Sequence, residues 1–121
     1  MEENTIAALP DAPVNLKELE DALEVAGAHE IAAGFIEDVA AVPEKLKNAL
    51  RFKDKDGIRS AAHLLKGCCL IIMAQQTAEL ASNMERMAIA GDLDQCDQLL
   101  PGLMDSLNNT INCLKTYLDE R

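Results

Sequence analysis

The sequence predicts an all-helical fold, an antiparallel up-down four-helix bundle with an additional short N-terminal helix. Three observations favour this class. The 121 residues are 49% apolar, with two Phe, one Tyr and no Trp, so the core must be built from aliphatic side chains. Apolar residues recur every three or four positions over long stretches, which is the spacing of one helix face. No stretch alternates apolar and polar residues as a half-buried strand does.

The N-terminal elements are predicted from capping residues and breakers. Residues 1–14 contain two prolines and are expected to form a flexible arm that precedes the bundle domain, residues 15–121. Asn15 is a suitable N-cap, with a glutamate three residues later in capping-box spacing. A short helix is expected over about 16–26, ending at Gly27.

A second helix is expected to begin at Ala28 or His29. Pro43 interrupts its pattern and should kink the helix or break it. His29 is interpreted as a solvated or helix-terminal residue. The apolar positions of this helix are three or four residues apart: Ile31, Phe35, Val39, Val42, Leu46 and Leu50.

Three further helices complete the bundle. They are expected over about 56–72, over about 74–90, and from the N-cap Asp92 to the C-terminus. Gly91 is expected to end the second of these three helices. Pro101 lies inside the last helix and should bend it. This helix has the most regular apolar stripe: Leu93, Cys96, Leu100, Leu103, Leu107, Ile111, Leu114 and Leu118.

Charge is distributed unevenly along the chain. The net charge of −10 argues against nucleic acid and anionic membranes as partners. The segment 45–66 contains seven basic and two acidic residues, for a net of +5, which leaves −15 on the remainder. This basic segment suggests that the protein steers an acidic partner surface towards itself. The alternative is that these charges only solvate a helix end and a loop.

No targeting or membrane segment is recognised. No apolar run approaches the roughly 20 residues of a membrane span, and the acidic start MEENTIAALPDAPV is unlike a signal peptide. We therefore expect a cytoplasmic protein with reduced thiols. The adjacent Cys68 and Cys69 do not match the spacing of a zinc site and are interpreted as inward-facing core residues, although a vicinal disulfide stays open.

His63 lies in the run AHLLKGCC. On a helical wheel, at about 100° per residue, the side opposite His63 collects apolar residues: Ile58, Ala61, Leu65, Cys68, Cys69 and Ile72. The outer face holds Arg59, His63, Lys66, Gly67 and Leu70. The histidine is therefore predicted to be exposed.

The neighbours of His63 suit a group that carries an anion. Lys66 and Arg59 are each one turn away and can reach an anion attached to the imidazole. Gly67 costs about 1 kcal/mol of helix stability relative to Ala, and it leaves room for the backbone of another protein. The alternatives for this glycine are a chance surface position or a packing contact. Exposed apolar residues around this centre indicate a docking surface: Leu64, Leu70 and Ile71.

Other chemistries are poorly supported. His63 has no second histidine or carboxylate on its own helix face, so a metal site lacks ligands. A Cys–His hydrolase is disfavoured because the cysteines face inward and no oxyanion loop is evident. The sequence contains no phosphate-binding loop of the G-x-x-x-x-G-K-[ST] type.

The stretch Ala62-His63-Leu64-Leu65-Lys66-Gly67 resembles the A-H-x-L-K-G signature of histidine phosphotransfer (HPt) domains of two-component phosphorelays. The resemblance covers about residues 16–119. It implies a four-helix bundle in which the imidazole Nε2 of His63 accepts a phosphoryl group and exchanges it with an aspartate of a response-regulator receiver domain. Lys66 would stabilise the phosphoryl oxygens, and Gly67 would give the receiver access. The chain departs from the family at Cys68, and at 71–74, Ile-Ile-Met-Ala, where a small residue and a glycine are usual.

The resemblance also implies the partners. We expect a monomeric phosphoryl carrier that is not an enzyme, has no ATP-binding kinase domain and no cofactor, and meets its Mg²⁺ on the receiver. Receiver domains or a hybrid histidine kinase would dock on Arg59, Leu64, Leu70 and Ile71. One alternative is a non-phosphorylated adaptor that binds a receiver or kinase through the same face. Another is a helical module with His63 as the axial ligand of a cofactor.

Overall fold

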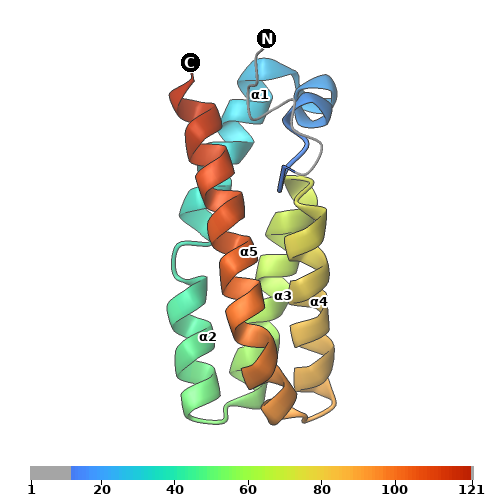
Figure 1. Ribbon diagram of the computed structural model, residues 1–121, viewed down its shortest axis with the longest axis vertical. Helices are drawn as coiled ribbons and strands as arrows, with labels where there is room; N and C mark the ends of the chain where they lie inside the picture. The colour runs from blue at the N-terminus through green and yellow to red at the C-terminus, as the bar shows by residue number, and fades with distance from the viewer. Residues whose placement is uncertain (1–11, 121) are drawn as a thin grey trace.

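The protein is all-helical and its helices pack antiparallel, as the sequence predicts. The computed structural model describes residues 12–120, and within this range the chain forms helices and no strand (Figure 1). The helices are α1 (Leu16–Asp38), α2 (Val42–Arg51), α3 (Lys55–Ile71), α4 (Gln75–Ile89) and α5 (Leu93–Asp119).

Four columns of helix surround the core. The second half of α1 and then α2 run down one side of the bundle, and α3, α4 and α5 supply the other three columns (Figure 1). Neighbours in the chain are neighbours in space, because α2 packs on α3, α3 on α4, and α4 on α5. The first part of α1 lies at the end of the bundle where α5 also ends, which matches the expected additional N-terminal helix.

The predicted helix end at Gly27 is wrong. The chain stays helical through Gly27, and the interruption lies at Glu24, which has φ 63° and ψ 169°. This break lets both halves of α1 face the core, because Leu16 and Leu19 are buried before it and Ala28, Ala32 and Phe35 after it. A glycine marks a position that tolerates unusual backbone angles, but here the packing on either side decided where the chain turns.

Pro43 separates two helices, as predicted. It lies in the first turn of α2, where a backbone N–H would have no helical partner, so the proline costs nothing there. The N-caps predicted at Asn15 and Asp92 are confirmed, since their side chains accept hydrogen bonds from the backbone N–H groups of Glu18 and Gln95 at 3.0 and 3.1 Å. Pro101 lies inside α5, and the helix continues through it.

The last three turns between helices share one geometry. Each contains one residue with a positive φ: Lys53 at 52°, Met73 at 62° and Gly91 at 78°. In each turn the N–H of the next residue donates to the carbonyl five residues back, which is the Schellman ending of a helix. The three N···O distances are 2.7, 2.8 and 2.9 Å (Asp54 to Ala49, Ala74 to Cys69, Asp92 to Met87). Only one of these positions carries glycine, so the sequence signals only that turn.

The core is aliphatic and follows the predicted stripes. Every apolar position of the α5 stripe is buried or packs against the core. Among the described residues, the buried polar side chains are Thr77 and Thr110. Their hydroxyl oxygens lie 2.9 Å apart, and Thr77 Oγ1 is 2.6 Å from the hydroxyl of Ser106, so α4 and α5 satisfy each other's buried hydroxyls. No described helix is both long and apolar enough to span a membrane.

Two side-chain placements correct the sequence interpretation. His29 is not helix-terminal, because it lies inside α1, and it is partly buried, with its ring centroid 4.4 Å from that of Tyr117. Its Nε2 atom is buried without a hydrogen-bond partner among the described residues. Cys68 is only partly buried, whereas Cys69 is fully buried. All four cysteines are free thiols, and burial raises the pKa of Cys69 to about 12.

The described residues include only part of the predicted arm that precedes the predicted domain boundary. Residues 1–11 of the predicted arm, 1–14, lie outside the described residues. Val14 is fully buried against the core. The division of the chain at residues 14 and 15 stays a prediction.

The turn geometry leads to a stability prediction. An L residue at positive φ costs about 1–2 kcal/mol, and glycine avoids this cost. Lys53 is exposed, so Lys53→Gly should raise the free energy of unfolding by about 0.5–1 kcal/mol. Gly91→Ala should lower it by about 1 kcal/mol, because a Cβ there meets no described atom within 4 Å and only the backbone is affected. Urea denaturation measures both changes. Equal stability of Lys53→Gly and wild type would contradict the assignment of strain to this turn.

Candidate functional site

His63 lies in the middle of α3 and points into solvent, as the helical wheel predicts. Its side chain is 65% exposed. The opposite face of the helix is buried in the bundle: Ile58, Ala61, Leu65 and Cys69. The core therefore fixes the backbone on which the imidazole stands, while the ring itself is accessible to a partner.

A carboxylate from the next helix holds the imidazole. Glu85 of α4 places Oε2 2.8 Å from His63 Nδ1 and Oε1 2.8 Å from Lys66 Nζ. A carboxylate only accepts hydrogen bonds, so the proton of the neutral ring belongs on Nδ1, and Nε2 keeps its lone pair. The site therefore presents a nucleophilic nitrogen in a defined tautomer.

Glu85 is well suited to stay ionised in this place. Its side chain is 12% exposed. The pKa of Glu85 is lowered below its ordinary value of 4.5, mainly by the hydrogen bond from Lys66. Burial acts in the opposite direction and raises this pKa, while the hydrogen bond from His63 lowers it further. The carboxylate is thus negative at neutral pH, where it pairs with the Lys66 ammonium and accepts the N–H of His63.

Sequence reasoning missed the contact between Glu85 and His63. The two residues are 22 positions apart and lie on different helices, so the wheel of α3 alone does not contain the pair. The position of the turn between α3 and α4 could have indicated this contact. Because α3 and α4 form an antiparallel hairpin with its turn near Met73, His63 is expected to face a residue close to 85. An acidic residue at that mirrored position is the pattern to look for.

The other predicted site residues lie around His63. Lys66 is 29% exposed and bridges to Glu85, and Arg59, one turn before His63, is partly exposed. A Cβ added at Gly67 would meet no described atom within 4 Å, so the surface above this residue is open. Three neighbours expected to dock a partner are exposed by 45, 52 and 62%: Leu64, Leu70 and Ile71.

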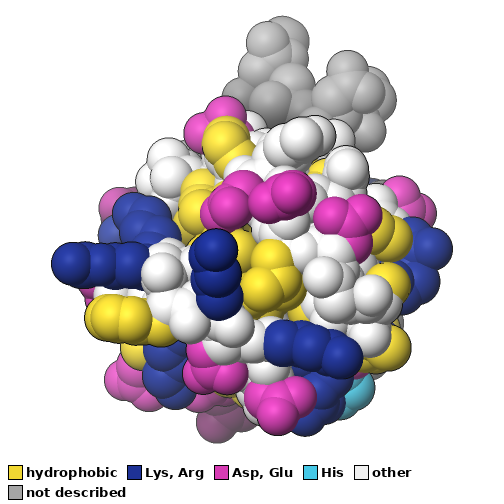
Figure 2. Space-filling model, turned by 90° about the horizontal axis from the view of Figure 1, so that it is seen from below, with side chains coloured by type: hydrophobic (Ala, Val, Ile, Leu, Met, Phe, Trp, Pro, Cys, Tyr) yellow, Lys and Arg dark blue, Asp and Glu magenta, His cyan; other side chains and the backbone are white. Residues whose placement is uncertain are grey.

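Charged and apolar side chains are mixed around the end of the bundle where α2 joins α3. Seen from this end, Figure 2 shows Lys and Arg side chains with Asp and Glu between them, and a histidine at the surface beside basic side chains. Within residues 12–120, no three His, Cys, Asp or Glu side chains are grouped as metal ligands would be. The arrangement is that of an exposed, hydrogen-bonded imidazole with cations nearby.

Comparison with known proteins identifies a family. A family model described as the Hpt domain matches residues 30–120. This range contains α2 to α5 entirely, together with His63, Lys66, Gly67 and Glu85. Neither the curated proteins nor the solved structures gave a match.

The contact between Glu85 and Lys66 leads to a pH prediction. Because the lysine is the main cause of the lowered pKa, Lys66→Met should raise the pKa of Glu85 more than His63→Ala does. The stability that Glu85 contributes is complete above pH 4.5 and is lost as the pH falls through its lowered pKa. Carboxyl ¹³C NMR titrations of the three proteins measure this. An unchanged titration of Glu85 in Lys66→Met would contradict the ion pair.

Proposed function

The chain belongs to the Hpt domain family, and we propose that it carries a phosphoryl group on His63 and exchanges that group with the aspartate of a response-regulator receiver domain. The family consists of phosphoryl carriers of phosphorelays, not kinases, and its members interact with receiver domains. The observation that carries the proposal is the exposed His63 imidazole, whose Nδ1 is 2.8 Å from the Glu85 carboxylate.

The hydrogen bond to Glu85 supports a specific transfer step. In this step Nε2 of the neutral imidazole attacks phosphorus in line with the bond to the aspartate oxygen of the receiver. The N–P bond forms, the P–O bond breaks, and the aspartate leaves as a carboxylate. The ring then carries a positive charge with the proton still on Nδ1, where the Glu85 carboxylate offsets it. The reverse step returns the phosphoryl group to a receiver.

Lys66 and Arg59 support the same step through charge. Phosphoryl transfer depends mainly on positioning and on offsetting the charge of the phosphoryl oxygens. Lys66 is held one turn from His63 by its 2.8 Å contact with Glu85, and a flexible ammonium can move from the carboxylate to a phosphoryl oxygen. Arg59 offers a second cation from the other side.

The proposal also covers the partner's charge, the source of Mg²⁺, the oligomeric state and the cellular location of the protein. The net charge of +5 on residues 45–66 is complementary to an acidic receiver pocket, and Mg²⁺ would be held there by the receiver. The chain would need no cofactor of its own and would act as a monomer in the cytoplasm. Under the adaptor alternative, the same face would bind a receiver or kinase without taking up phosphoryl groups.

The first prediction concerns the acceptor residue. With a phosphorylated receiver domain as donor, wild-type protein should take up acid-labile label and His63→Gln should take up none, because glutamine has no nucleophilic nitrogen. His29→Gln is the matched control, since His29 is the other histidine of the chain, and it should be labelled like wild type. Labelling of His63→Gln to the wild-type level would contradict the proposal, and absence of label on wild type would favour the adaptor.

The second prediction concerns access to His63. Gly67→Leu should leave the bundle folded, because leucine is a good helix former and the added Cβ meets no described atom within 4 Å. The larger side chain should displace the receiver and slow transfer at least about tenfold. Gly102→Leu is the matched control, since Gly102 lies in α5 and its added Cβ is equally free. Equal transfer rates for the two variants would exclude Gly67 as the point of access.

A further inference from the structure

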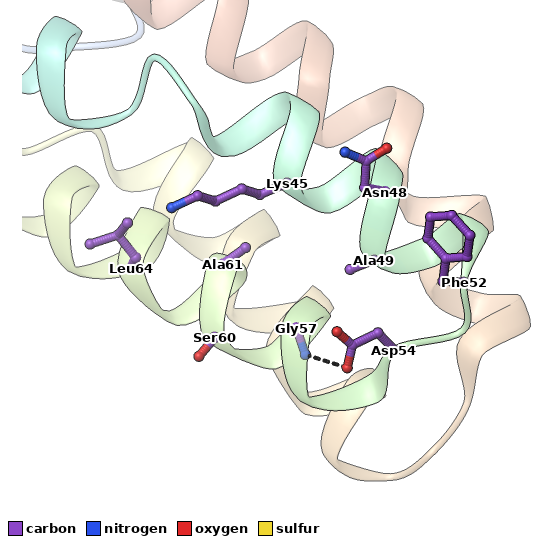
Figure 3. Close-up of a pocket in the computed structure, with 9 residues that line it drawn as sticks. All are labelled: Lys45, Asn48, Ala49, Phe52, Asp54, Gly57, Ser60, Ala61 and Leu64. Carbon is purple, nitrogen blue, oxygen red and sulfur yellow. Dashed lines mark hydrogen bonds between the residues drawn. The ribbon is translucent and has the colours of Figure 1, made fainter.

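One hollow of the bundle lies away from the face that carries His63. A hollow of about 580 Å³ between α2 and α3 includes Leu64 in its wall, so it belongs to the face where we expect a receiver to dock (Figure 3). The α4–α5 hollow, of about 250 Å³, is a different one, and its wall includes Pro13, Gln76, Leu80, Asp105, Ser106 and Asn109. At about 100° per residue, Gln76 and Leu80 lie about 180° and 140° around α4 from Glu85. The α4–α5 hollow therefore stays open when a partner covers His63.

A chain of hydroxyl groups borders this hollow and has a fixed direction. Thr110 Oγ1 donates to the carbonyl oxygen of Ser106 at 3.0 Å. Because a hydroxyl has only one proton, Thr77 is the donor in its 2.9 Å contact with Thr110. By the same count, Ser106 donates to Thr77 in their 2.6 Å contact. The proton of Ser106 is therefore directed into the bundle, and its oxygen is left to accept a hydrogen bond from a group in the hollow.

The other polar groups of the α4–α5 hollow also favour a cation. Asp105 is exposed, and its carboxylate has no ion-pair or hydrogen-bond partner within residues 12–120. Gln76 and Asn109 can each present an amide oxygen, and no described Lys or Arg is part of the wall. Helix α5 carries four aspartates and one cation, Lys115, which lies about 15 Å along the helix from Asp105. A positively charged donor thus meets acceptors and no described competing cation.

The wall of the hollow also has an apolar part, to which Leu80 and Pro13 contribute. An arginine side chain fits both parts, because its methylene groups can cover apolar surface while its planar guanidinium donates two parallel hydrogen bonds to a carboxylate. Further N–H groups of the guanidinium remain for neighbouring oxygens. A lysine ammonium is more strongly hydrated and lacks the paired geometry. The chemistry of the hollow therefore favours arginine over lysine.

We propose that the α4–α5 hollow binds an arginine side chain of a partner protein, with the guanidinium donating to the Asp105 carboxylate and to the hydroxyl oxygen of Ser106. A partner is the source, rather than the free amino acid, because no described cation lines the hollow to pair with an α-carboxylate. Residues 1–15 of the chain contain no Lys or Arg either, so this segment does not supply the cation. A basic partner is complementary to the net charge of −15 outside residues 45–66. The inference goes beyond the proposed phosphotransfer and does not depend on it.

The test uses blocked arginine as the probe. Nα-acetyl-L-arginine amide is titrated into the ¹⁵N-labelled full chain, and the backbone amide shifts are followed by NMR. The shifts of Asp105, Ser106 and Leu80 should saturate with a Kd of about 1–10 mM, the weak affinity of one solvent-accessible ion pair. Blocked lysine should bind at least about threefold more weakly. Blocked citrulline, which has the shape of arginine without its charge, should not bind.

A pair of matched variants tests the carboxylate. Asp105→Asn removes the charge and keeps the size of the side chain, so it should weaken the binding of blocked arginine at least about tenfold. Asp97→Asn is the control, because Asp97 is exposed on the same helix, lies outside the wall of the hollow and gives the same change of charge. Its affinity for blocked arginine should equal that of wild type.

Four results would overturn the inference. No saturable binding of blocked arginine, or equal binding of blocked citrulline, would exclude the site. Equal affinities of Asp105→Asn and Asp97→Asn would exclude the carboxylate contact. Largest shifts at Glu85 and Lys66 would place the guanidinium on the carboxylate beside His63 instead. Free L-arginine that binds at least about tenfold more tightly than blocked arginine would identify a small-molecule site and exclude a partner's side chain as the source.

Discussion

The Glu85 carboxylate, held between His63 and Lys66, is the interaction on which the rest of the site depends. Its two oxygens each accept one hydrogen bond of 2.8 Å, so a single side chain of α4 sets the tautomer of the histidine and the position of the lysine on α3. A carboxylate this little exposed would be costly without partners, and the hydrogen bonds from His63 and from the Lys66 ammonium offset that cost. The same arrangement leaves Nε2 of His63 free.

That contact requires a fixed register between α3 and α4. A shift of one residue would rotate Glu85 by about 100° around its helix, away from His63. The register is set below the surface by fully buried side chains of both helices, among them Leu65 and Met84. It is also set by the turn between them, where Met73 adopts a positive φ and Ala74 donates to Cys69 at 2.8 Å. The geometry of this turn is therefore part of what positions the residues of the surface site.

The uneven charge of the chain has a structural counterpart. The basic segment that begins at Lys45 includes most of α2 and the first half of α3, whereas α1 is strongly acidic. Because α1 and α2 follow one another down the same side of the bundle (Figure 1), the acidic and the basic segments lie one after the other along that side. A bundle with a net charge of −10 thus presents a basic region beside the exposed histidine without losing its overall repulsion towards nucleic acid.

Helical periodicity in the sequence by itself determined the fold class, the apolar stripes and the exposure of His63, and single residues determined two N-caps and the break before α2. These are local properties, because 3.6 residues per turn decide which side chains share a face. The tertiary structure decided the break at Glu24, the partial burial of Cys68 and His29, the positive φ of Lys53 and Met73, and the pairing of Glu85 with His63. Each of these depends on how neighbouring helices pack and where the chain turns between them, which the pattern of a single helix does not contain.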